Sequence, residues 1–177
     1  RRNVCRYFGR VRRCHDLPRK RFTNFTKEKD VMEYQELKER IKEHEGYRNK
    51  VYLDSLGKRT IGYGHLCRSD EKWDDDKQYD HRHLEKVFEY DFAIAVRGAD
   101  EILKDCPNIS EIAREVVIEC VFVLGKTGFS RFKKCIEGLS KSDYQSASEE
   151  LKDSVWYKNQ ATNRVHYLSQ ILEGIEQ

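Results

Sequence analysis

Two acidic side chains and one hydroxyl in this sequence could together break a glycosidic bond. Glu45 ends a run with helical apolar spacing and precedes Gly46, a residue type that commonly ends helices. Negative charge is disfavoured at the carboxyl end of a helix, so this position suits a carboxyl group that keeps its proton. Asp54 ends one short β-type run and Thr60 lies in the next. A hairpin could bring both beside the helix end, where Asp54 and Thr60 could direct a water at a sugar bond.

The residues around this trio resemble a known family pattern. Glu45-Gly46, Tyr52-Leu53-Asp54 and Thr60-Ile61-Gly62-Tyr63-Gly64-His65 are similar to the active-site segment of the phage-type (T4-like) lysozymes, the endolysins of glycoside hydrolase family 24. Further family-like segments follow in the same order, so the resemblance covers most of the chain after residue 30. These segments are residues 95–98, 121–128 and 156–164.

This resemblance implies a substrate and a reaction. The substrate would be bacterial peptidoglycan, cut at the β-1,4 bond between N-acetylmuramic acid and N-acetylglucosamine, with bacteriolytic action. Glu45 would be the acid, while Asp54 and Thr60 would direct a water or Asp54 would stabilise the sugar cation. No cofactor and no metal are expected, since no cysteine pair has C-x-x-C spacing. Two alternatives are a catalytically inactive wall-binding antimicrobial protein and a chitinase-like glycosidase.

The resemblance also assigns supporting residues. Arg164 matches a family arginine that reaches toward the catalytic glutamate, and His65 is expected to hold the hairpin in shape. Tyr63 and Phe122 would line the sugar groove. At two further groove positions the chain differs from the family pattern, with a cysteine in place of a serine and a glutamate in place of an asparagine. The predicted sugar-contacting residues are therefore Tyr63, Phe122, Cys135 and Glu150.

The elements that position these residues are predicted from local patterns. We expect a helix over residues 31–45, strands over 50–53 and 59–61, and a long helix from an Asp80 cap to about residue 104. From Ser110 onward the patterns indicate helices alone. The first is nearly all apolar and is ended by a turn at Gly125 and Gly128, and Trp156 is expected in the core. The predicted fold is α+β and predominantly helical: a lysozyme-like, two-lobed fold with a small β-hairpin lobe (31–80), a connecting helix (about 80–104) and a helical lobe (about 105–177).

The first 22 residues differ in charge from the rest of the chain. They hold nine Lys or Arg and one Asp, a net charge of +8, whereas the remainder holds 25 basic and 30 acidic residues. We expect residues 1–22 to be attracted to anionic bacterial envelopes rather than to nucleic acid. Cys5 and Cys14 could pair in a hairpin turning at Gly9-Arg10; a disordered leader, or a strap over the acidic body, is the alternative. Residues 23–30 are interpreted as a linker.

Cysteine content bears on the compartment. Six cysteines, an even number, fit an oxidising environment and predict disulfide bonding in a secreted protein. The alternative location is that of a phage endolysin, which passes from the host cytoplasm to the cell wall. For Cys120, the alternative to a disulfide bond is a buried free thiol. A monomer is expected.

Overall fold

The computed structural model describes residues 34–54, 56–159 and 161–175. The predicted basic segment 1–22 and the linker 23–30, with the Cys5–Cys14 hairpin, lie outside these residues. The described residues from Glu36 onward form one compact unit. The elements in chain order are α2 (Gln35–Glu45), β1 (Arg48–Leu53), β2 (Arg59–Gly62), β3 (His65–Leu66), α3 (His81–Ile102), the short 3-10 helix η2 (Leu103–Asp105), α4 (Glu111–Phe129), α5 (Lys133–Ser140), α6 (Tyr144–Lys152), α7 (Val155–Asn159) and α8 (Thr162–Glu173).

The three strands form an antiparallel sheet in the order β1-β2-β3. In β1 and β2, Tyr52 pairs with Thr60, which brings the end of the first strand beside the start of the second. The predicted hairpin is therefore present. The third strand was not expected, because two residues are too short to show an alternating pattern; it forms where Ile61 pairs with His65 across a tight turn.

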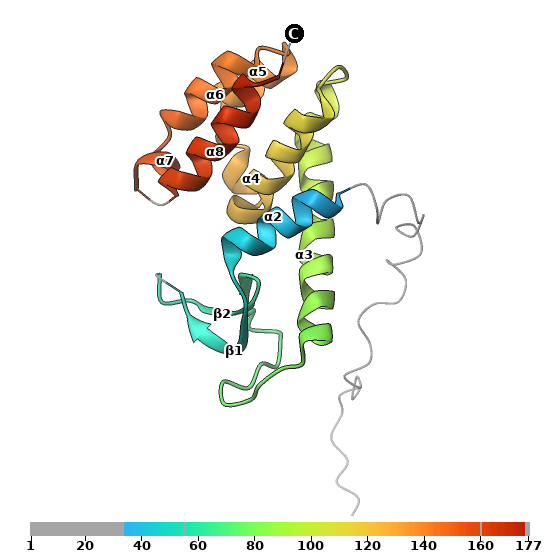
Figure 1. Cartoon of the computed structure of the whole chain (residues 1–177), viewed down its shortest axis with the longest axis vertical. Coiled ribbons are helices and arrows are strands. Elements are labelled where there is room, and N and C mark those ends of the chain that lie inside the picture. Colours follow the sequence, from blue (N-terminus) through green and yellow to red (C-terminus); the bar gives the residue numbers. More distant parts are fainter. Residues whose placement is uncertain (1–33, 55, 160, 176–177) are drawn as a thin grey trace, which may run out of the picture. The chain divides into compact units, whose positions relative to one another are not determined.

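The long helix α3 links the sheet to the helical part of the molecule. Asp80 caps it as predicted, its side chain accepting from the backbone N–H of Arg82 at 3.2 Å. Its buried positions, among them Leu84, Phe88 and Phe92, recur every three to four residues and make one apolar face. The helix contacts β2 and β3 toward one end and α4 toward the other, so α3 runs beside both groups of elements (Figure 1).

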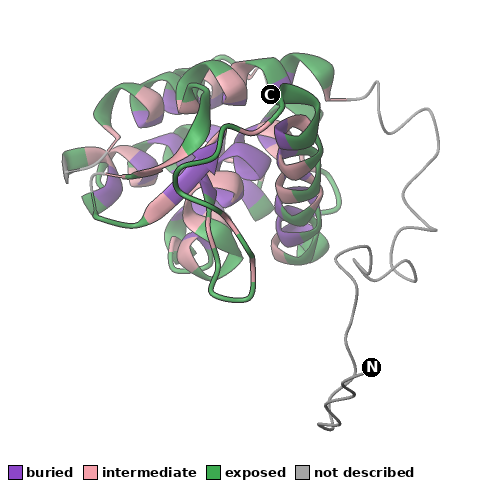
Figure 2. Cartoon of the chain, turned by 90° about the horizontal axis from the view of Figure 1, so that it is seen from below, coloured by how far each residue is buried: buried purple, intermediate pink, exposed green. Residues whose placement is uncertain are grey.

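Helix α4 supplies the centre of the helical part. Ser110 caps it, and residues 116–121 are all buried. Gly125, with φ 69° and ψ 160°, was expected to end this helix; instead it kinks the chain, which then resumes helical structure as far as Phe129. Helices α5, α6 and α8 pack together beyond it, and buried segments gather on the inner faces of the helices (Figure 2). Trp156, 5% exposed, lies in the core as predicted.

The cysteines correct one expectation. In the described part of the chain all four cysteines, Cys67, Cys106, Cys120 and Cys135, are free thiols, and Cys120 is fully buried. The predicted disulfide bonding therefore finds no support among the described residues.

The arrangement as a whole is the α+β, mostly helical fold expected from the sequence. Over the same residues, no helix has the length and apolar content that crossing a membrane requires.

Candidate active site

The carboxyl group of Glu45 is held from two sides. Helix α2 ends at this residue, where the N–H of Gly46 donates to the carbonyl of Lys42 at 2.9 Å. From α8, Arg164 Nη1 donates to Glu45 Oε1 at 2.7 Å. The other oxygen lies so close to the turn between β2 and β3 that a Cβ added at Gly64 would stand 2.6 Å from it. The side chain is 21% exposed, so its carboxyl is fixed but open to a substrate.

Asp54 and Thr60 are fixed by the turn that joins β1 to β2. Asp54 Oδ1 accepts from the backbone N–H groups of Leu56 and Lys58, each at 2.8 Å. The hydroxyl of Thr60 donates to the carbonyl of Lys58 at 3.1 Å, and the residue is 5% exposed. Lys58 thus contacts both side chains. Because the Thr60 proton is used in this bond, the hydroxyl oxygen can serve a water as an acceptor.

Tyr52 lies within electrostatic reach of both acids. Burial is the largest cause that raises its pKa; Arg48, whose guanidinium lies 4.4 Å from the centre of the Tyr52 ring, opposes that rise. The negative charges of Glu45 and Asp54 both add to the increase in pKa. The charges of both acids therefore act on the Tyr52 phenol in the same direction.

Beneath Glu45 lies a buried ionic network that the sequence patterns did not predict. Glu119 of α4 is 0% exposed, yet its carboxylate is 2.9 Å from Arg40 Nε and 2.9 Å from His44 Nδ1, both on α2. Arg164 Nε stands 3.9 Å from the same carboxylate. The available signal was a single acidic residue inside the apolar run of residues 116–121. A charge there is costly unless it is paired, so its presence indicates partners from other helices.

His65 joins β3 to α3 and to the loop between them. Its Nδ1 lies 2.7 Å from Asp91 Oδ2 and its Nε2 lies 2.9 Å from Glu71 Oε2, while the residue is 6% exposed. Burial acts to lower the pKa of His65, but Asp91 and Glu71 outweigh it and the net shift is upward. Burial likewise acts to raise the pKa of Glu71, but hydrogen bonds from the Arg68 backbone, His65 and Trp73 lower it to about 2.

These shifts predict how stability depends on pH. Because the pKa of His65 is raised in the folded protein, protonated His65 stabilises the fold at pH values below 6.5, the ordinary pKa of this side chain. This contribution is lost as the pH rises through the pKa of the folded state. The lowered pKa of Glu71 stabilises the fold above 4.5 and is lost as pH falls toward about 2. The contribution of this cluster to the free energy of unfolding should therefore be largest between about pH 4.5 and pH 6.5.

Thermal unfolding followed across pH checks this prediction. His65→Asn should lower the free energy of unfolding at pH 6 by about 3 kcal/mol, because two carboxylates lose their buried partner. The exposed His166 offers the control, since His166→Asn removes an imidazole that lies on the surface. Equal pH dependence for the two variants would contradict the assigned role of His65.

The predicted sugar contacts are not all available. Tyr63 donates its hydroxyl to Glu85 Oε1 at 2.9 Å, and burial followed by that bond raises its pKa to about 12. Phe122 is half-buried, and its ring centre lies 5.6 Å from that of Phe88. The predicted contact at Cys135 is corrected: the residue is 1% exposed and burial raises the pKa of its thiol to about 12, so it belongs to the core.

Glu150 is half-buried and pairs with Lys134 at 3.3 Å, which links α6 to α5. This ion pair ties it to the helical part of the molecule rather than to Glu45. Among the residues that the structure describes, no group of three or more His, Cys, Asp or Glu side chains could hold a metal ion.

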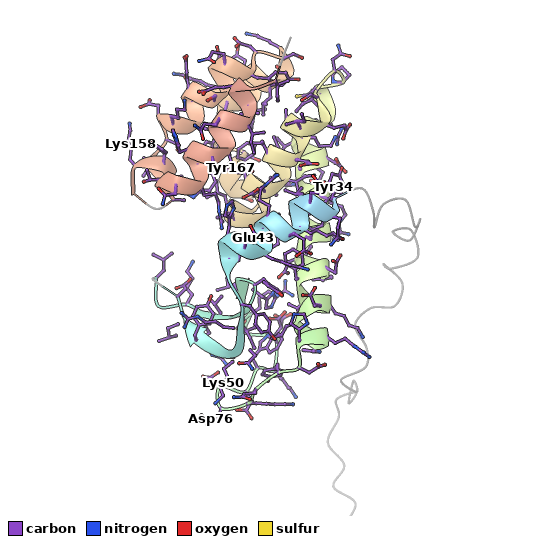
Figure 3. All side chains as sticks on the ribbon, in the orientation of Figure 1. Tyr34, Glu43, Lys50, Asp76, Lys158 and Tyr167 are labelled. Carbon is purple, nitrogen blue, oxygen red and sulfur yellow. The ribbon has the colours of Figure 1, made fainter. Side chains whose placement is uncertain are left out.

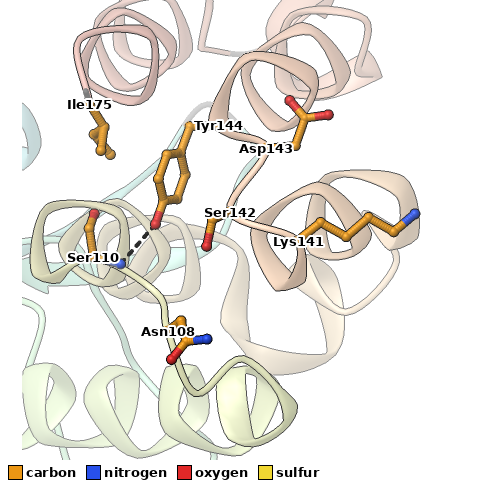
Figure 4. A pocket seen from close by; sticks show the side chains of 7 residues that line it. All are labelled: Asn108, Ser110, Lys141, Ser142, Asp143, Tyr144 and Ile175. Carbon is orange, nitrogen blue, oxygen red and sulfur yellow. Dashed lines mark hydrogen bonds between the residues drawn. The ribbon is translucent and has the colours of Figure 1, made fainter. Parts of the chain in front are cut away.

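A separate hollow lies where the start of α4 meets the turn between α5 and α6 (Figure 4). Tyr144 closes one side, its hydroxyl accepting from the backbone N–H of Ser110 at 2.9 Å. Lys141 pairs with Glu137 at 2.7 Å, and Asp143 caps α6. The hollow contains none of the predicted site residues, and these polar groups are already paired, so it is assigned no role.

Comparison with known proteins places the Glu45 region in a family. Residues 42–170 match the family described as phage lysozyme. A protein of Dictyostelium discoideum named "Probable T4-type lysozyme 1" is 25% identical over 162 residues, covering 77% of this chain and 93% of the relative. A second from the same organism, "Probable T4-type lysozyme 2", is 23% identical over 142 residues, covering 68% of this chain and 84% of the relative. The family match spans well over half of the sequence, including Glu45, Asp54, Thr60 and Arg164, and the chain therefore belongs to the phage lysozyme family.

Proposed function

We propose that this protein is a muramidase that hydrolyses the β-1,4 bond between N-acetylmuramic acid and N-acetylglucosamine and thereby lyses bacteria. Membership of the phage lysozyme family supports a lysozyme-type peptidoglycan hydrolase. The observation that carries the finer proposal is the carboxyl of Glu45, held by Arg164 from α8 and set against the hairpin at Gly64. An acid fixed in this way at the edge of a hairpin that carries a second acid is suited to glycoside hydrolysis.

In the proposed reaction Glu45 gives its proton to the oxygen that leaves the anomeric carbon. A water held by Asp54 and Thr60 attacks that carbon as the glycosidic C–O bond breaks, and its proton passes to Asp54. The products are one new reducing end and one new hydroxyl, with no other reactant. A water between the sugar and Asp54 implies inversion at the anomeric carbon.

Product analysis tests this proposal. Purified peptidoglycan is digested, reduced with borohydride and hydrolysed to its amino sugars. Muramitol is expected, because a muramidase leaves the new reducing end on N-acetylmuramic acid. Glucosaminitol, together with faster cleavage of chitin oligomers, would indicate a chitinase-like glycosidase. Unchanged peptidoglycan that retains the protein in the pellet would indicate wall binding without catalysis.

For residues 1–22 we propose attraction to the anionic bacterial envelope, supported by their nine basic residues against one acidic residue. Deleting them should reduce the lysis rate of whole cells on the order of tenfold at low salt, because exposed charges attract over a distance that salt shortens. The same deletion should leave cleavage of soluble fragments unchanged. Lysis rates that are equal at low and at high salt for both forms would dismiss the envelope role.

A further inference from the structure

Glu119 is the fully buried carboxylate of the Glu45 region, and the reaction above does not use it. It lies on α4, and its partners come from two other helices that meet there. Arg40 and His44 reach it from α2, each at 2.9 Å, and Arg164 approaches from α8 at 3.9 Å. A buried carboxylate is costly unless charged or hydrogen-bonded partners surround it, and here they converge on one point.

The guanidinium of Arg164 is shared between two carboxyl groups. Its Nη1 donates to Glu45 at 2.7 Å, and its Nε lies on the side of Glu119. The arginine side chain is 14% exposed, so solvent screens it weakly. Without a second carboxylate, the positive charge of this enclosed guanidinium would act on Glu45 alone.

We propose that Glu119 is a positioning residue for hydrolysis, which orients Arg164 and balances its positive charge so that Glu45 can deliver a proton. The inference rests on the proposed function. The charged and titratable groups that face Glu119 come from all three helices and act on it together. They are Arg40 and His44 on α2, Glu115 and Cys120 on α4, and Arg164 on α8. Three of these have further partners: Arg164 also binds Glu45, and Tyr167 of α8 contacts Arg40 and His44.

The test is the pH dependence of kcat/KM on soluble peptidoglycan fragments. Glu119→Gln keeps the size of the side chain and removes its charge, which leaves Arg164 to act on Glu45 alone. The alkaline limb of the profile should move to lower pH by on the order of one unit, given the short distances and low exposure. At neutral pH kcat should fall on the order of tenfold while KM changes little, because the substrate does not touch Glu119.

Glu115 offers a matched control on the same helix. Its carboxylate lies 3.7 Å from Arg40 Nη2, and its ion pair is with that residue rather than with Arg164. Glu115→Gln therefore removes the same charge while leaving the shared arginine in place, and the alkaline limb of its profile should move far less than that of Glu119→Gln. A merely structural Glu119 would lower the melting temperature of Glu119→Gln and leave its alkaline limb in place, which would overturn the inference.

Arg40→Gln provides a second variant should Glu119→Gln fail to fold. This side chain is 19% exposed, and its loss leaves Glu119 with less positive charge around it. The alkaline limb should then move to higher pH, opposite to the Glu119→Gln shift. If the parent is active and Glu119→Gln and Arg40→Gln both show the pH profile of the parent, this inference is overturned while the proposed function stands. A parent that cleaves no fragment overturns the proposed function, and this inference with it.

Discussion

Glu45→Gln is expected to slow the clearing of a peptidoglycan suspension about a thousandfold, the scale of a lost general acid. The amide has nearly the same size and its oxygen can still accept from Arg164, so the fold should persist. The amide cannot protonate a leaving oxygen at neutral pH. Loss of turbidity at constant protein concentration measures the effect, with melting temperature followed in parallel.

Glu43 supplies the control for this experiment. It lies on α2 two residues before Glu45, is exposed and carries the same charge (Figure 3). Glu43→Gln should clear the suspension at the parent rate. If both variants clear at that rate, Glu45 is not the acid. If both lose activity together, the general charge of α2 matters rather than one placed proton.

Gly64→Ala is expected to reduce activity on the order of a hundredfold and to lower the free energy of unfolding by about 2 kcal/mol. The residue has φ +80°, which is strained for any side chain, and the added Cβ would stand 2.6 Å from Glu45 Oε2. The carboxyl of Glu45 must then move. A displacement of about 1 Å at a catalytic group is enough to cost two orders of magnitude in rate.

Gly125→Ala separates strain from displacement. Gly125 has φ +69° and no heavy atom within 4 Å of an added Cβ, and it lies at the kink of α4. This variant should lose on the order of 1–3 kcal/mol of stability, since φ 69° with ψ 160° is a backbone conformation that side chains rarely adopt, and it should keep the parent activity. Activity in Gly64→Ala equal to that of Gly125→Ala would show that the Gly64–Glu45 contact has no catalytic importance.

Local rules predicted much of this fold from the sequence. Asp80 was recognisable as a helix cap because an Asp side chain can accept from backbone N–H groups within the next few residues, and Ser110 marked the start of the helical region without being predicted as a cap. The end of α2 at Glu45 followed from Gly46, and the hairpin from two short β-type runs. Strand β3 escaped prediction because its pairing depends on the turn that precedes it rather than on its own two residues.

The site was harder to predict from the sequence than the fold, because its contacts join distant segments. Arg164 and Glu45 are 119 positions apart, and only the family resemblance connected them. Glu119 gives a local signal, a charge in an apolar run, but its partners on α2 and α8 are set by helix packing. Cys135 could have been recognised as core, because its spacing to the buried Gly138 and Leu139 defines one inward face of α5.

The most direct test of the central claim is a crystal structure of the Glu45→Gln variant with a peptidoglycan fragment of several disaccharides. The proposed mechanism predicts that the glycosidic oxygen between N-acetylmuramic acid and N-acetylglucosamine lies within hydrogen-bond reach of the side chain at position 45. Asp54 and Thr60 should then face the anomeric carbon across one water. A fragment whose glycosidic oxygens all lie far from position 45, or that binds elsewhere on the protein, would contradict it.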